Sequence, residues 1–437
     1  MRIYDYEAAF GAGDKTSRAM RDAIDGWFRL YYDTDATTRS DPCQRVAYTV
    51  VNKLVKTVFG EYKASTDSPF GAALLHRIEP LARSAVQLAL IGGECYLKPC
   101  PETDGFSFTL ISRQDVLIFA RDSAGMPTDM GTVERSTHGK YYYTLLERRT
   151  LDGQGRLQIA NQLYRSLTGQ SLGIRVPLNS HPEYAALEES YCYETPIGSV
   201  GLVQVKTPML NCVDGSSDGV SVYAAAAGLI RNIDRNEAQL CGEFERGESR
   251  IIASADLLRG QEGLQDHLFV GLDDDPEQVG ITVFSPPLRE QSYLARKQEY
   301  LRNVESIIGL KRGMLSDANT EDRTATEIAA SAGDYSLTVI DFQTMWEQAL
   351  RKIAALCCKL GQLYGLCREK EVPAIQVDWG NGVLYDEDKA WESYRLMVRE
   401  GLLRPEVALG WRFGMPAETE EQMAAIRKKL MPEKRAE

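Results

Sequence analysis

Residues 11–20 (GAGDKTSRAM) are the first stretch whose residue types could do chemistry, because glycines followed by Lys15 and Thr16 are ingredients of a phosphate-binding loop. Such a loop needs a glycine directly before the lysine, so that backbone N–H groups can wrap a phosphate, and a buried strand leading into it. Here Asp14 precedes Lys15, and the residues upstream show no strand pattern. We therefore expect no nucleotide site at this position.

The remaining chemistry-bearing residues are scattered. The acidic run 273–277 (DDDPE) lacks the alternating acidic positions and the closing glutamate of a calcium-binding loop. We interpret it as a solvated acidic turn, with a docking surface for basic partners as the alternative. Four histidines and nine cysteines show neither ligand spacing nor a CxxC pair. The sequence therefore predicts no metal site, no cofactor, no disulfide framework and no catalytic triad, and we expect no enzyme activity.

The charge balance limits the possible partners. Fifty basic and 62 acidic residues give a net charge of −12, whereas non-specific DNA binding usually needs a basic face. Contact with nucleic acid should therefore be sparse or local. No run of apolar residues approaches the length of a membrane span, and the first residues (MRIYD) do not resemble a signal peptide. We expect a globular protein of cytoplasmic origin with no membrane contact.

The elements that must position these residues change type along the chain. Apolar residues at spacings of three or four predict helices over residues 1–90. After Gly92 and Gly93 the pattern alternates and is rich in aromatic and β-branched residues, which predicts antiparallel strands. Turn signals separate these strands at 104–105, 124–125 and 152–153. The order of elements indicates an α+β protein.

Two long helical stretches follow the strands. The first begins at about Ser221 and has Gly247 as its stop, and the second covers residues 289–310. After a polar loop, a third helix begins behind Thr324, with Glu327 at the spacing of a capping box. At ~1.5 Å per residue its proline-free run would span on the order of 60 Å, so we expect its apolar seam to exceed what one monomer can bury.

Two readings from other classes stay open at this point. Long helices joined by a polar loop could form an antiparallel coiled coil within one monomer, which would make the protein a cytoplasmic helical scaffold with no DNA role. A hydrolase with an unrecognised site is the weaker alternative. Both alternatives predict a small particle in solution, so measuring its mass distinguishes them from a large assembly of many subunits.

Several segments, in this order, resemble a tailed-bacteriophage portal protein of the siphophage and prophage type, the head–tail connector family. GGECYLKP (92–99) is similar to a strand of the wing in these proteins, and GVSVYAAAAGLIRNIDRNEAQLCGEFERGESRIIAS (219–254) to the first stem helix leading into the clip. YLRNVESIIGLKRGMLSDANTEDRTATEIAASAGDYSLTVIDFQTMWEQALRKI (300–353) resembles the second stem helix, the tunnel loop and the helix toward the crown. IQVDWGNGVLYDEDKAWE (375–392) resembles the tryptophan-centred segment that follows.

The resemblance departs from the family pattern in two places. The segment around Trp379 has Gly-Asn-Gly where acidic residues are more usual, and the tunnel loop lacks the Gly-Thr-Phe-Ser phrase that many relatives carry.

The resemblance implies a portal-protein fold with an α/β wing, long stem helices, a small clip and a short helical crown, assembled as a ring. The corresponding boundaries are 1–219 for the wing, 220–247 for the first stem helix, 248–287 for the clip, 288–310 for the second stem helix, 311–324 for the tunnel loop, 325–365 for the long helix, and 366–437 for a C-terminal wing strand and the crown helices.

The resemblance also implies a function. About twelve copies would form the ring at the unique capsid vertex and conduct double-stranded DNA during packaging and ejection. Terminase, a separate ATPase, and the head–tail adaptor would dock on this ring, and capsid and scaffolding proteins would surround it. The protein would be made in the bacterial host cytoplasm and end in the virion.

Three groups of residues follow as candidate sites. The tunnel loop would bring Lys311, Arg312, Asp317 and Arg323 to the DNA channel, with ordinary solvated charges as the alternative. Docking of partners would fall on Asp273, Asp274 and Asp275 of the clip. The seam of the long helix would be shared with the neighbouring subunit through Tyr335, Val339, Phe342 and Trp346.

Overall fold

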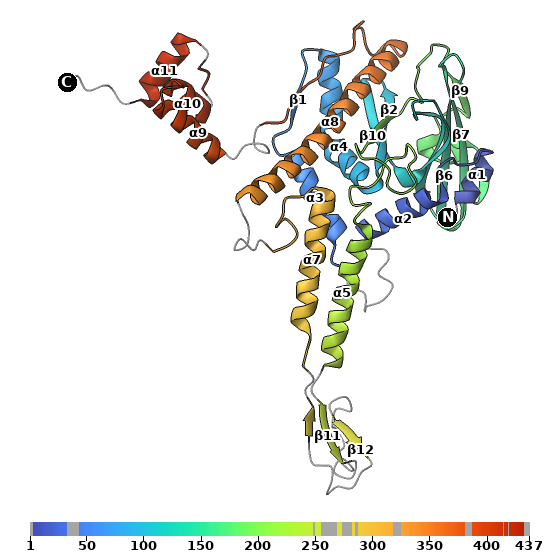
Figure 1. Ribbon diagram of the computed structural model, residues 1–437. Helices are drawn as coiled ribbons and strands as arrows, with labels where there is room; N and C mark the ends of the chain where they lie inside the picture. Colours follow the sequence, from blue (N-terminus) through green and yellow to red (C-terminus); the bar gives the residue numbers. More distant parts are fainter. Residues whose placement is uncertain are drawn as a thin grey trace. The chain divides into compact units, whose positions relative to one another are not determined.

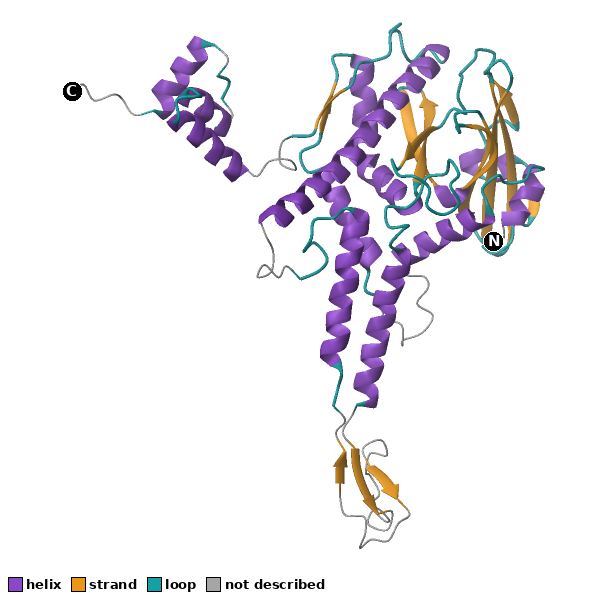
Figure 2. Ribbon diagram, viewed as in Figure 1, coloured by secondary structure: helices purple, strands orange, loops and turns teal. Residues whose placement is uncertain are grey.

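The computed structural model describes residues 3–32, 43–247, 250–254, 269–272, 282–284, 287–317, 325–380, 387–413, 415–417 and 419–431. Two compact units make up the chain: Met1–Val58 with Ala64–Val377, and Phe59–Lys63 with Asp378–Glu437. Figure 1 follows the elements along the sequence, and Figure 2 distinguishes helices from strands. Helices combine with mostly antiparallel sheets, which agrees with the predicted α+β class.

Helices dominate the first ninety residues, as predicted. They are α1 (Ile3–Phe10), α2 (Arg18–Tyr32), α3 (Val46–Val58) and α4 (Pro69–Gly92), and the short strand β1 (Lys63–Ser65) interrupts them. At the start of α4, the side chain of Ser68 accepts a hydrogen bond from the backbone N–H of Gly71, and proline occupies the first helical turn. Gly93 ends α4 with a φ of 84°, which glycine adopts without steric cost.

Two antiparallel sheets follow. The smaller has the order β10-β2-β3, with β2 (Glu94–Glu102), β3 (Gly105–Ser112) and β10 (Val203–Lys206). The larger has the order β4-β5-β6-β7-β8, with β9 paired to β7. Its strands are β4 (Val116–Arg121), β5 (Pro127–His138), β6 (Tyr141–Leu151), β7 (Leu157–Ser166), β8 (Ile174–Val176) and β9 (Ser190–Cys192). All three predicted turn signals coincide with connections between paired strands.

The connection between β6 and β7 shows how side chains make such a turn. Asp152 Oδ1 accepts hydrogen bonds from the backbone N–H groups of Gln154, at 2.9 Å, and Arg156, at 2.8 Å. Gly155 adopts the left-handed conformation with a φ of 76°. The turn is therefore confirmed, but the glycine that makes it possible is Gly155 rather than Gly153.

The two sheets meet over a shared hydrophobic core. Tyr96 of β2, Ile118 of β4 and Met130 of β5 are buried together, with Val200 and Leu202 of the segment before β10. Helix α8 (Ala325–Leu363) packs on β10 and β2 and on the helices α3 and α4. The core of the larger unit therefore joins elements from both halves of the sequence.

Helices α5 (Ala227–Arg246) and α7 (Glu290–Ile308) run side by side in opposite directions (Figure 1). Three strands lie between them in sequence, β11 (Arg250–Ser254), β12 (Phe269–Leu272) and β13 (Thr282–Phe284), with β11 parallel to β12 and antiparallel to β13. We call α5 and α7 the stem pair.

The first stem helix begins later than predicted. It starts at Ala227 rather than near Ser221, because buried hydrogen bonds hold the preceding residues in turns. The backbone N–H of Val222 and the hydroxyl of Ser221 both donate to the carbonyl of Leu90, and the Tyr223 hydroxyl donates to the carbonyl of Trp27. The predicted stop at Gly247 is confirmed, since its N–H returns to the carbonyl of Glu243.

The smaller unit contains the C-terminal helices α9 (Glu387–Arg399), α10 (Pro405–Arg412) and α11 (Glu420–Leu430). Tyr394 of α9 packs on Trp411 of α10, with ring centroids 4.7 Å apart. Thr419 and Gln422 form a capping box at the start of α11. Strand β14 (Gln376–Asp378), which pairs with β1, precedes these helices. Their assignment to a wing strand and a crown stays a prediction.

Candidate functional site

The predicted tunnel loop is described from Lys311 to Asp317, and we call residues 311–317 the loop root. Lys311, Arg312 and Asp317 are all exposed there. Arg323 lies outside the described residues. The root follows α7 directly, and the backbone N–H of Met314 donates to the carbonyl of Lys311 at 3.1 Å, which closes a tight turn.

A buried carboxylate organises the loop root. Glu305, near the end of α7, is 1% exposed. Its Oε1 accepts hydrogen bonds from the backbone N–H groups of Gly313, Leu315 and Ser316 at 3.1, 2.6 and 2.9 Å, and its Oε2 accepts one from the Ser316 hydroxyl at 2.8 Å. Neighbouring backbone N–H groups that converge in this way form a concave site for a negative charge, which Glu305 fills.

The end of α7 gives the chain the direction this arrangement needs. Gly309 adopts the left-handed conformation with a φ of 76°, and the N–H of Leu310 returns to the carbonyl of Glu305 at 2.8 Å. A Cβ at Gly309 would lie 2.5 Å from the hydroxyl oxygen of Thr338 in α8. The glycine therefore serves both the reversal of the chain and the close approach of α7 to α8.

Other elements hold the root and its surroundings as well. The Lys53 ammonium of α3 donates to the carbonyl of Met314, and the backbone N–H of Asp317 donates to Gln298 Oε1 of α7 at 2.9 Å. Close by, the hydroxyls of Thr57 in α3 and Tyr335 in α8 are 2.6 Å apart. The loop root is thus joined to α3 and α7, where both meet α8.

The seam of α8 is already covered within the chain. Val339 and Trp346 are 0% exposed and Phe342 is 2% exposed, while Tyr335 is only half-buried. For Val339, Phe342 and Trp346 the expectation that one monomer cannot bury the seam is therefore wrong, because α3, α4, β2 and β10 supply packing partners for α8. Exposed apolar side chains lie elsewhere, at Leu337 of α8 and at Leu294 and Ile307 of α7.

Polar contacts join the stem pair. Lys297 of α7 forms an ion pair with Glu237 of α5 at 2.8 Å, and Arg289 forms one with Glu243 at 2.7 Å. The side chain of Asn236, which is 3% exposed, donates to the carbonyl of Tyr293 at 3.0 Å. Such contacts fix the register between the two helices more than they stabilise the fold, because the ion pairs are partly or largely solvated.

Asp273, Asp274 and Asp275 lie outside the described residues, immediately after β12. The described part of the predicted clip consists of the three-stranded sheet β12-β11-β13.

In the stretch 11–20, where a phosphate-binding loop was considered, the side chain of Asp14 forms hydrogen bonds with the backbone. Asp14 Oδ1 accepts hydrogen bonds from the backbone N–H groups of Thr16, at 3.1 Å, and Ile118, at 3.0 Å. Asp14 also pairs with Arg21, and the N–H of Lys15 donates to the carbonyl of Ile118. These contacts fasten the loop to β4, so the backbone amides are engaged within the protein.

Buried ion pairs connect the two sheets with their surroundings. Arg113, 0% exposed, lies 2.6 Å from Glu94 and 3.0 Å from Asp218. Burial opposes the charge of Arg113, but Glu94 and Asp218 outweigh it and raise the arginine pKa. At Glu147 burial likewise opposes ionisation, yet Arg149 and Lys98 hold the carboxyl pKa at about 2.

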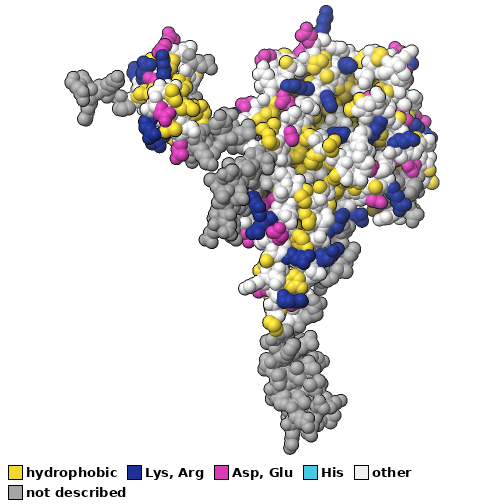
Figure 3. Space-filling view, in the orientation of Figure 1, with side chains coloured by type: hydrophobic (Ala, Val, Ile, Leu, Met, Phe, Trp, Pro, Cys, Tyr) yellow, Lys and Arg dark blue, Asp and Glu magenta, His cyan; other side chains and the backbone are white. Residues whose placement is uncertain are grey.

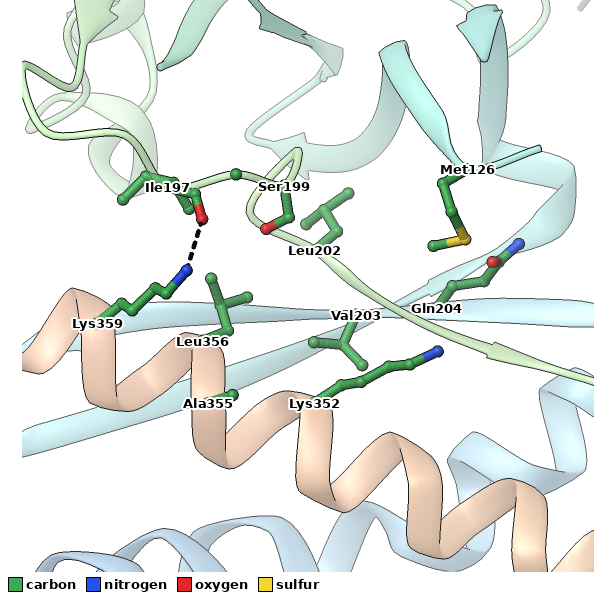
Figure 4. A pocket seen from close by; sticks show the side chains of 11 residues that line it. Met126, Ile197, Ser199, Leu202, Val203, Gln204, Lys352, Ala355, Leu356 and Lys359 are labelled. Carbon is green, nitrogen blue, oxygen red and sulfur yellow. Dashed lines mark hydrogen bonds between the residues drawn. The ribbon is translucent and has the colours of Figure 1, made fainter. Parts of the chain in front are cut away.

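Sequence reasoning missed a groove of about 230 Å³ between α8 and the segment 197–204 (Figure 4). Apolar side chains form most of its lining, and Lys352 and Lys359, two helical turns apart on α8, border it. The Lys359 ammonium donates to the carbonyl of Ile197 at 3.3 Å. The lining residues include no histidine, cysteine or carboxylate, so the groove offers no acid–base pair.

The described residues hold no cluster of three or more potential metal ligands. Within the same ranges, no helix has the length and apolarity that a membrane crossing requires.

The fold and the loop root together define a mixed α/β protein with an antiparallel stem pair, a small sheet between its helices in sequence, a loop root held by hydrogen bonds, and the long helix α8. The sequence profile of the family described as "Phage portal protein, SPP1 Gp6-like" matches residues 76–432. The chain belongs to this family of phage portal proteins. No curated protein matches the chain.

Proposed function

We propose that about twelve copies of this chain form a closed ring at the unique capsid vertex, and that double-stranded DNA passes through the ring during packaging and ejection. Membership of the portal family over residues 76–432 is the observation that carries this proposal. Family membership also disfavours the helical scaffold and the hydrolase as alternatives. The contacts between α5 and α7 lie within one chain, so they are compatible with a ring of subunits and with a monomeric scaffold.

In the proposed ring, the loop between α7 and α8 faces the DNA. Lys311 and Arg312 lie exposed at one end of this loop, Asp317 supplies the opposite sign, and Arg323 stands near the other end in sequence. A ring multiplies every phosphate contact by its number of subunits, so each contact must be individually weak if DNA is to move. A loop of mixed charge meets this requirement better than a basic one.

The proposed docking site for terminase and for the head–tail adaptor is the clip, with Asp273, Asp274 and Asp275 as its acidic contacts. Terminase would supply the energy for translocation, and capsid and scaffolding proteins would contact the outside of the ring. Reversing the three charges should leave ring formation intact and weaken capture of terminase or adaptor in pull-downs. Unchanged capture of both partners would leave the acidic run without this role.

The proposed subunit interface rests on exposed apolar residues. Val339, Phe342 and Trp346 are buried in their own chain, so of the originally expected set only the half-buried Tyr335 remains a direct candidate. Leu294, Ile307 and Leu337 are 43%, 48% and 63% exposed. Figure 3 shows hydrophobic and basic side chains together on the visible face of the stem pair. A heterologous contact that closes on itself would cover such a face.

Packaging of DNA into procapsids that carry variant rings tests the DNA-conducting role. Lys311→Ala and Arg312→Ala should disturb packaging or DNA retention without changing ring assembly. Adding basic charge, with Asp317→Lys and Asp322→Lys together, should slow translocation because the phosphates would be held more strongly, and raising the salt concentration should relieve the effect. Parental packaging rates for the lysine variant at low salt would contradict a loop that approaches DNA.

A further inference from the structure

The Glu305 carboxylate accepts four hydrogen bonds from the described residues of the loop root. Three backbone N–H groups and one hydroxyl of the loop root donate to it, and it is 1% exposed. Ionised carboxylates accept shorter and stronger hydrogen bonds than neutral groups do. A single side chain of α7 therefore bonds three of the four residues from Gly313 to Ser316.

The same residue bears on where the cations of the root lie. Glu305 holds the chain on both sides of the turn closed between Lys311 and Met314: the N–H of Leu310 donates to its backbone carbonyl, and the N–H of Leu315 donates to its carboxylate. Lys311 and Arg312 project from this turn and are exposed. Their positions relative to the stem thus depend on a group that does not itself reach solvent.

The same root is fastened to a second element. Lys53 of α3 bonds the carbonyl of Met314, and α3 contacts α8 through Thr57 and Tyr335. The Gln343 side chain of α8 donates to the carbonyl of Val58 at the end of α3. The hydrogen bonds of Glu305 therefore couple the loop root to α7, and the hydrogen bond of Lys53 couples it to α3. The exposed residues of the root take no part in these bonds.

We propose that Glu305 is a positioning residue for DNA movement: it fixes the loop root, so that Lys311 and Arg312 stand at a set height and orientation on the stem. This inference rests on the proposed function of the loop. It assigns to Glu305 no contact with DNA, because the side chain is enclosed by the residues that it holds.

Two variants and one control test the proposal. Glu305→Ala removes the acceptor entirely, and Glu305→Gln keeps its shape but removes the charge. The control is Glu299→Gln on the same helix, where the side chain is 62% exposed and forms an ion pair with Arg302 of the neighbouring turn, at 3.8 Å. All three are assembled as full-length rings, and their masses are compared with the parental ring before any DNA is added.

The first readout is hydrogen exchange at the amides of Gly313, Leu315 and Ser316, which needs no DNA. Exchange should rise at least about tenfold in Glu305→Ala and less in Glu305→Gln, because the amides lose a charged acceptor, while Glu299→Gln should match the parental protein. Parental exchange at these amides in Glu305→Ala rings would overturn the proposal. If that variant does not assemble, the same criterion applies to Glu305→Gln.

The second readout is DNA packaging and retention in procapsids. Both Glu305 variants should reduce it several-fold, and combining either with Lys311→Ala and Arg312→Ala should add little, because both changes act on the same contact. Normal packaging by rings with a loosened root would overturn the inference about Glu305. If Lys311→Ala and Arg312→Ala package normally too, the proposed function of the loop fails as well; if they alone are impaired, only the inference about Glu305 fails.

Discussion

Glu147 lies between Arg149 and Lys98, and the two cations outweigh the cost of burying its charge. Its pKa is about 2 in the folded protein, against about 4.3 in an unfolded chain. A depressed pKa contributes stability that is present above pH 4.3 and is lost as the pH falls toward 2. We expect the free energy of unfolding to fall by about 3 kcal/mol over this window from Glu147 alone.

Urea unfolding of the purified protein between pH 2 and 7 measures this dependence, and Glu147→Gln should flatten it. Glu79→Gln, at an exposed position of α4, should leave the curve unchanged. An equally steep loss of stability in parental and Glu147→Gln proteins would show that other carboxylates dominate.

At this scale the sequence revealed little. Glu147, Glu305 and Arg113 look like ordinary charges within mixed segments, because only the folded chain shows which neighbours surround them and how deeply they are buried. Arg113, for example, meets residues 19 positions before and 105 positions after it in sequence. For Lys352 and Lys359 a signal existed, since a spacing of seven places both on one face of a helix, but nothing in the sequence indicated the apolar groove between them.

Among the elements, the junction of α7 and α8 depends on one glycine. Gly309→Ala should lower the free energy of unfolding by about 1–3 kcal/mol, because alanine is strained in the left-handed conformation and its Cβ would meet Thr338. Gly228 near the start of α5 has open space around it and no positive φ. Gly228→Ala should therefore be neutral or slightly stabilising. Thermal unfolding of both variants and of the parental protein measures the two effects. Equal effects of the two substitutions would count against a special role for Gly309.

Most elements were predictable, for reasons that are local. Apolar periodicity identified the helices, and turn residues at 104–105, 124–125 and 152–153 separated the strands. The start of α5 was misplaced because buried hydrogen bonds from Ser221 and Val222 to Leu90 override a helical pattern. Local patterns do not contain such tertiary competition.

At the scale of the whole molecule, charged substitutions at exposed apolar residues should affect assembly, whereas those at buried residues should affect the stability of the monomer. Asp at Leu294 and Ile307, both exposed on α7, should favour monomers that remain folded. Val339→Asp should instead destabilise the monomer itself by several kcal/mol, because a charge would be buried without a partner. Light scattering and thermal unfolding of each variant separate the two effects, and a stable, monomeric Val339→Asp protein would restore the seam as an interface.

The proposed ring is tested most directly by the mass and appearance of the purified protein. With a subunit mass of 48.8 kDa, a ring of about twelve copies should exceed half a megadalton by size-exclusion light scattering. Electron micrographs of that fraction should show closed rings with a central channel. A single species near 48.8 kDa at every concentration, with no rings in the micrographs, would contradict the account.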